Sequence, residues 1–148
     1  MKILIKIEDK KCLPTVDELV EIMWQKGINL SRVGEQDSLT NGTSLSLSWD
    51  KWLDDERWKR HPKFKEYIYF EIESTHNEQK LSIEVDGSAC FVDMRAVYKA
   101  VEFIAERCNA LISTNNDEWL QLSEFRTSVD NYLKTSFSDA VEQSLLIT

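Results

Sequence analysis

The sequence contains little glycine and little proline, four and two residues among 148. This scarcity argues against a long disordered linker, because flexible chain segments are enriched in such residues. It also excludes a glycine-rich phosphate loop, since four isolated glycines cannot form G-x-G-x-x-G or a Walker pattern. We therefore expect a single domain over residues 1–148. At this length one core buries roughly two-thirds of the surface of the unfolded chain.

Cysteine and histidine are also few. Cys12, Cys90 and Cys108 lie far apart with no C-x-x-C pattern, and His61 and His76 lie in charged or turn segments. Structural metal sites bring such residues together at short spacing, so the sequence predicts no metal site and no cofactor. The odd number and wide spacing of the cysteines predict three free thiols in a reducing compartment.

The chain is poor in positive charge and in long apolar runs. Its 18 Lys and Arg residues against 26 Asp and Glu give a net charge of −8. Nucleic-acid binding needs clustered cations, so the net charge argues against an ordinary nucleic-acid-binding protein. The surplus of acid favours a cationic partner or serves only solubility. Lys6 interrupts the apolar N-terminal run, which is too short for a signal peptide or a membrane span. We therefore expect a cytoplasmic protein without membrane contact.

What the sequence does contain is alternation with a period of two. From Glu66 to Asp86, two alternating runs flank a polar turn, a pattern typical of a half-buried hairpin. The apolar positions of this hairpin are Ile68, Phe70, Ile72, Leu81, Ile83 and Val85. Further runs predict strands over 2–8, 28–33 and 43–49, with Asn41-Gly42 as the hairpin turn between the last two.

Apolar residues at helical spacing predict the helices. Thr15 and Glu18 form a capping-box pattern, and Asp93 is the predicted N-cap of a long helix that ends near Cys108. Further helices are expected within 123–145. With one more short strand before them, the order resembles βαββαβ. The predicted fold is α+β and ferredoxin-like: a mainly antiparallel sheet with helices on one face, an extra hairpin and C-terminal helices.

The polar positions of the hairpin form the candidate binding surface. They are Tyr67, Tyr69, Glu71, Glu73, Glu84 and Asp86. Alternation places them opposite the core, with Glu71 and Glu84 as near neighbours. Tyrosine rings supply contact area and carboxylates steer a basic protein partner. The alternatives are paired carboxylates for acid–base catalysis or a merely solvated face.

The segment 49–65 carries three tryptophans among charges of both signs and fits no strand period. We expect a short helix or an irregular excursion there. Trp52, Asp54 and Asp55 are predicted to border the binding surface, although the tryptophans could equally close the edge of the core. In the alternative function, a cleft beside Trp49–Trp58 would serve a small enzyme or a small-molecule-binding protein.

After Asp93 the chain reads NALIST, NNDEW and LQLSEF. This stretch, over residues 93–126, resembles bacterial immunity proteins of polymorphic toxin systems, which often carry a helix, a strand, an acidic turn with Trp and a capped helix. The resemblance implies a small, acidic, non-enzymatic cytoplasmic protein that neutralises a basic toxin domain by covering its active site. It implies no catalytic residue. A homo-oligomer paired through a strand edge remains open.

Overall fold

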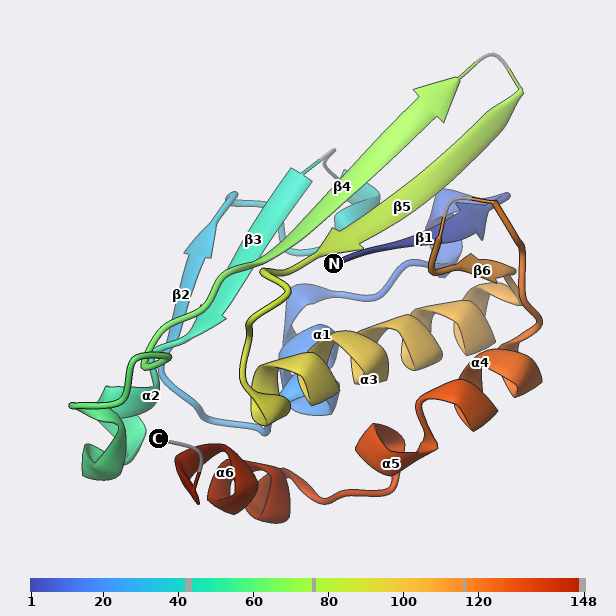
Figure 1. Cartoon of the computed structure of the whole chain (residues 1–148). Helices are drawn as coiled ribbons and strands as arrows, with labels where there is room; N and C mark the ends of the chain where they lie inside the picture. The colour runs from blue at the N-terminus through green and yellow to red at the C-terminus, as the bar shows by residue number, and fades with distance from the viewer. Residues whose placement is uncertain (42–43, 76, 116, 147–148) are drawn as a thin grey trace.

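An antiparallel sheet forms the centre of the computed structural model, which describes residues 1–41, 44–75, 77–115 and 117–146 (Figure 1). Six strands are found in this described part of the chain, in the spatial order β2-β3-β4-β5-β1-β6. They are β1 (Lys2–Ile7), β2 (Leu30–Val33), β3 (Ser44–Trp49), β4 (Ile68–Thr75), β5 (Glu78–Glu84) and β6 (Ile112–Ser113). Every neighbouring pair runs antiparallel.

The longest helix, α3, packs against α1, α6 and the sheet, and helices α3 to α6 lie together on one side of the sheet (Figure 1). The helices are α1 (Val16–Met23), α2 (Lys51–Asp54), α3 (Phe91–Cys108), α4 (Leu122–Ser128), α5 (Asp130–Leu133) and α6 (Phe137–Leu146). Single 3-10 turns occur at Lys10–Cys12, Leu39–Asn41 and Glu56–Trp58. None of the helices in the described residues has the length and apolar character needed to cross a bilayer.

The α+β class and the antiparallel sheet are confirmed, but the ferredoxin-like topology is not, because the strand order differs. In a split βαβ unit, two strands joined through a helix are separated by an intervening strand. β5 and β6, joined through α3, follow this rule with β1 between them. β1 and β2, joined through α1, are instead separated by β3, β4 and β5. The antiparallel pair of β2 and β3, which corresponds to the predicted extra hairpin, therefore lies at one edge of the sheet, beside β4.

The central hairpin forms as the alternation predicts. Tyr69 pairs with Glu84 and Phe70 pairs with Ile83 in the antiparallel register of β4 and β5. The apolar positions are all buried, with Ile72 the most exposed of them at 8%. The strand predicted over 43–49 also forms, as β3. The turn predicted at Asn41-Gly42 includes Gly42, which lies outside the described residues.

The start of α1 matches its prediction, and the start of α3 does not. The Thr15 hydroxyl accepts from the Glu18 amide at 3.1 Å, and the Glu18 carboxylate accepts from the Thr15 amide at 3.0 Å. The N-cap of α3 is Cys90, so Asp93 lies inside the first turn. Asp93 is fully buried, where it forms an ion pair with Lys51.

The expectation of three free thiols is wrong. Cys12 and Cys108 form a disulfide with their Cα atoms 5.2 Å apart, which leaves Cys90 as the free cysteine. The two bonded residues are 96 positions apart in sequence, but the C-terminal end of α3 packs beside the turn that contains Cys12. Sequence spacing cannot reveal this proximity, and the argument from free thiols to a reducing compartment no longer holds.

Candidate functional site

The face of the sheet opposite α3 carries the predicted polar surface. Tyr69, Glu71 and Glu84 are exposed there, and the Tyr69 side chain retains 49% of its accessible surface. Glu71 lies opposite Ser82, while Glu84 lies opposite Tyr69. Glu71 and Glu84 are therefore diagonal neighbours on one face, which agrees with their predicted proximity. We call this surface the open face.

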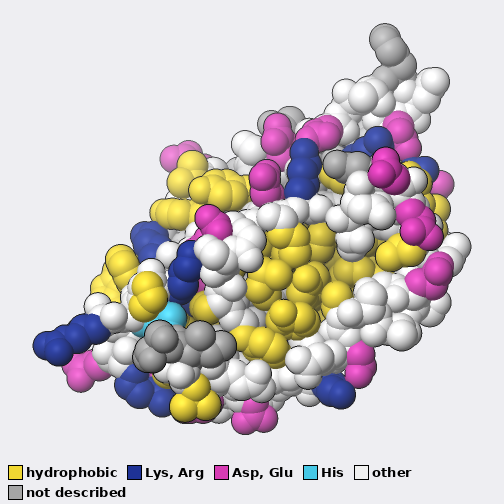
Figure 2. All heavy atoms as spheres, in the orientation of Figure 1, with side chains coloured by type: hydrophobic (Ala, Val, Ile, Leu, Met, Phe, Trp, Pro, Cys, Tyr) yellow, Lys and Arg dark blue, Asp and Glu magenta, His cyan; other side chains and the backbone are white. Residues whose placement is uncertain are grey.

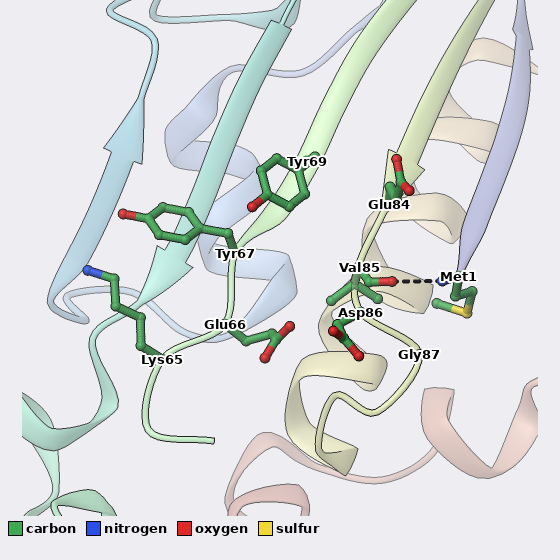
Figure 3. Close-up of a pocket in the computed structure, with 9 residues that line it drawn as sticks. All are labelled: Met1, Lys65, Glu66, Tyr67, Tyr69, Glu84, Val85, Asp86 and Gly87. Carbon is green, nitrogen blue, oxygen red and sulfur yellow. Dashed lines mark hydrogen bonds between the residues drawn. The ribbon is translucent and has the colours of Figure 1, made fainter. Parts of the chain in front are cut away.

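A hollow of about 740 Å³ lies where the chain enters β4 and leaves β5 (Figure 3). Its lining includes four of the predicted site residues: Tyr67, Tyr69, Glu84 and Asp86. In Figure 3 the carboxylates of Glu66 and Asp86 point toward each other from its two sides. The amino group of Met1 closes one end by donating to the Val85 carbonyl at 2.8 Å.

Two carboxyl groups in this hollow are shifted in opposite directions. Burial raises the pKa of Glu66, and the nearby charges of Asp93 and Asp86 raise it further against the opposing effect of Lys63. Hydrogen bonds from the hydroxyl and amide of Ser88 lower the pKa of Asp86. Asp86 is thus held as a carboxylate at neutral pH, whereas Glu66 takes up a proton more readily.

Lysines from β1 neutralise part of the acid on the open face. Lys2 contacts Glu73 at 3.2 Å, and Lys6 contacts Glu78 at 3.5 Å. Lys80 also contacts Glu78 at 3.5 Å. The sequence shows only Lys80 within residues 66–93, because β1 is brought beside β5 by the fold alone.

Glu71 and Glu84 keep their charges available. Within the described part of the chain, neither carboxylate has an ion-pair partner or accepts a side-chain hydrogen bond. A cationic group from another molecule could approach both of them without first displacing a lysine of this chain. Together with the exposed carboxylate of Asp86, these two residues provide the negative charge that this part of the hairpin presents to another molecule.

An aromatic row borders the hollow. The Lys65 ammonium lies 5.7 Å from the ring centre of Trp52 and 5.2 Å from that of Tyr67. Trp52 packs edge-on against Phe64 at 5.3 Å, and Tyr67 lies 6.3 Å from Tyr69. Lys65 therefore connects Trp52 to Tyr67. Phe64, which is 44% exposed, was missed because it lacks strand periodicity.

Asp54 and Asp55 lie apart from the tyrosine hollow and hold the local chain. Asp54 accepts from the Asn29 amide at 2.9 Å, the Asn29 side chain at 2.6 Å and the Trp49 indole at 2.8 Å. Asp55 caps the following turn and contacts Arg57 at 2.8 Å. Both carboxylates line a separate hollow of about 250 Å³ beside Trp49. This is the cleft that the small-molecule alternative requires, but its acids are already engaged.

The other two tryptophans of this segment belong to the core. Trp49 and Trp58 are 3% and 0% exposed and meet edge-on at 5.9 Å. The segment thus closes the edge of the core with two rings and presents the third, Trp52, toward the surface. Closure of the core edge is thus confirmed for Trp49 and Trp58, while a role of Trp52 at the binding surface stays a prediction.

Replacing Asp54 with alanine should lower the free energy of unfolding by about 2 kcal/mol, because the indole of Trp49 loses a charged acceptor. Burial raises the pKa of Asp54, but hydrogen bonds from Asn29 and Trp49 outweigh it, and the pKa falls below its usual range. Its stabilising effect is therefore present at neutral pH and is lost as the pH falls below about 4. Urea unfolding at pH 7 and pH 3 measures this, and an equal loss at both pH values would contradict it.

The described residues contain no group of three or more His, Cys, Asp or Glu side chains arranged to hold a metal ion. What this surface offers is cation recognition by carboxylates and rings. Comparisons with protein-family models, with curated proteins and with solved structures find no match for this chain.

Proposed function

We propose that this chain is a non-enzymatic binding protein that docks a basic protein domain on the open face. In keeping with the resemblance of residues 93–126, we infer that it acts as an immunity protein for a toxin domain. The observation that carries the proposal is the exposed part of the open face, where Glu71 and Glu84 lie beside the exposed Tyr69 and form no ion pair with any described residue. Such a surface attracts a basic partner and provides ring area for contact.

The mechanism is occlusion guided by charge. The unpaired carboxylates accelerate encounter with a positively charged surface, and the effect weakens as salt screens the charges. Tyr67, Tyr69 and Trp52 then supply contact area, with Lys65 held between the rings. No bond of the partner is broken in this scheme, because covering its active site is sufficient for neutralisation.

The double replacement Glu71→Lys/Glu84→Lys should slow association with the basic partner by at least about tenfold at low salt. Products of neighbouring genes are the first candidates to test as this partner. The expected cause is reversal of the local field at the open face. The measurement is the association rate constant by stopped-flow fluorescence or surface plasmon resonance across a series of salt concentrations. The difference from the wild type should shrink as salt increases.

Glu21→Lys/Glu35→Lys is the matched control, because it makes the same change in net charge at exposed positions outside the open face. Its association rate should fall much less. Equal slowing by both variants would assign the effect to net charge, and no slowing by the first would remove the open face from the proposal. A neighbouring gene product that does not bind at all would remove the immunity function.

A further inference from the structure

An apolar groove adjoins the hollow on the other side of the loop after β5. Gly87 lines the hollow, while Ser88, the next residue, lines the groove. The groove has a volume of about 430 Å³, and its apolar lining includes Ala89, Phe91, Met94 and Tyr132. The two depressions are thus separated by one turn of chain, so one extended segment of a partner could reach both.

The apolar lining continues from the groove back to the hollow. Phe91 stacks on Tyr132 with ring centres 4.6 Å apart, and Tyr132 lies 4.8 Å from Tyr98. The Tyr98 hydroxyl lies 3.4 Å from the sulfur of Met1, which itself lines the hollow. Figure 2 shows a broad apolar area over the region of α3. These side chains are partly exposed, so apolar surface connects the groove with the hollow.

The polar groups around the groove already have partners. Lys63 donates to the Ser88 hydroxyl at 2.9 Å and lies 3.6 Å from Glu66 in the hollow. The His61 ring contacts the Ser144 carbonyl at 3.1 Å and the Lys63 amide at 3.0 Å. A docked group therefore meets rings and aliphatic carbons rather than an unpaired charge.

Cys90 belongs to the same lining. Burial raises the pKa of its thiol to about 11, with the charge of Asp93 adding to the effect. The thiol is therefore neutral at physiological pH and contributes apolar contact rather than reactivity.

We propose that the groove is a second subsite of the binding surface, which receives an apolar side chain of the partner while a neighbouring Arg or Lys enters the hollow. This inference rests on the proposed function. The partner is a protein segment rather than a lipid or a second copy, because the adjoining hollow offers a cation the rings of Tyr67 and Tyr69 together with the carboxylates of Glu84 and Asp86, neither of which forms an ion pair with a described residue. An apolar anchor in a groove beside a charged rim is the usual organisation of an interaction hot spot.

Short synthetic peptides provide the probe. In the first set, two arginines are joined to a tryptophan by a spacer of zero to three serines. The second set has serine in place of the tryptophan. The third set keeps the tryptophan and has glutamine in place of both arginines. The best member of the first set should bind at least about tenfold more tightly than its relatives in the other sets. Nitrogen-15 NMR should show amide shifts at Glu84 and at Met94 together.

Ala89→Trp fills the groove and should abolish the gain from the peptide tryptophan while leaving the affinity of the arginine-only peptide unchanged. Met94→Gln should reduce the affinity gained from the peptide tryptophan, because it makes the groove more polar with little change in side-chain volume. It replaces Ala89→Trp in the test if that variant folds poorly. Ile22→Trp, which changes a partly exposed residue of α1, should have no effect.

The outcomes separate the two proposals. Salt-dependent binding of arginine peptides without a gain from tryptophan would overturn the groove and leave the proposed function standing. No salt-dependent binding of any arginine peptide would count against both. If the peptides bind through tryptophan equally tightly with or without arginine, the groove is an independent apolar site. If the protein forms a dimer that Ala89→Trp dissociates, the occupant of the groove is a second copy of the chain. Each of these results overturns the inference.

Discussion

Replacing Lys51 with methionine should lower the free energy of unfolding by about 3–5 kcal/mol, the cost of leaving a buried charge without its partner. The Lys51 ammonium lies 2.6 Å from the Asp93 carboxylate, and both side chains are 0% exposed. Asp93→Asn should have an effect of similar size, because it leaves the lysine charge in the same position. Chemical unfolding followed by tryptophan fluorescence measures both losses.

The surroundings of this ion pair explain why the expected effect is large. The Trp24 indole donates to Asp93 at 3.2 Å, and the Lys51 ammonium lies 5.4 Å from the ring centre of Trp58. The carboxylate also lies in the first turn of α3, where the helix dipole favours negative charge. Water cannot take the place of the missing charge at a fully buried site, so a single substitution leaves the remaining charge without its ion-pair partner.

A double variant and a surface pair test this account. Lys51→Met/Asp93→Leu should recover most of the loss, because apolar residues of similar volume replace buried ion pairs at little net cost. Lys134 and Asp130 form a pair at 3.3 Å with both side chains 66% exposed. Lys134→Met should therefore change stability by less than about 0.5 kcal/mol. Similar losses at Lys51 and Lys134, or a double variant as unstable as the sum of the single variants, would contradict this account.

The sequence predicted those parts of the fold in which burial acts on neighbouring residues. Alternation predicted the hairpin of β4 and β5 because only one face of each strand packs on the core. Side chains along a strand point to opposite faces in turn, so the buried residues recur at every second position. The Thr15 capping box was likewise predictable, since both partners lie within one helical turn. Exposure of Tyr69 and Glu84 on the open face follows from the same alternation.

Features that depend on distant segments could not be predicted. Nothing in β1 indicates that it lies between β5 and β6, so the approach of Lys2 to Glu73 was not visible. Lysine is seldom fully buried, so nothing in the composition of residues 49–65 indicated the ion pair of Lys51. Asp93 matched a cap by residue type, but its true role needs a partner 42 positions away. The Asp54 hydrogen bonds to Asn29 were hidden for the same reason.

Reduction of the Cys12–Cys108 disulfide should lower the free energy of unfolding by about 3–4 kcal/mol and the melting temperature by roughly 10 °C. The bond joins residues 96 positions apart, so breaking it releases a long loop in the unfolded chain and increases its entropy. In the folded state it ties the turn at Lys10–Cys12 to the last residue of α3. Thermal unfolding with and without a thiol reductant measures the change.

The variant Cys12→Ser/Cys108→Ser should reproduce the effect of reduction and should no longer respond to the reductant. Cys90→Ser is the matched control and should respond as the wild type does, since its thiol takes no part in the bond. Thiol titration of the unfolded, unreduced chain should give one reactive group. Three titratable thiols there, or equal melting temperatures with and without reductant, would mean that the bond does not form or does not stabilise the fold. Since the disulfide holds the end of α3 remote from the groove at Phe91, its loss should reduce stability much more than affinity at the open face.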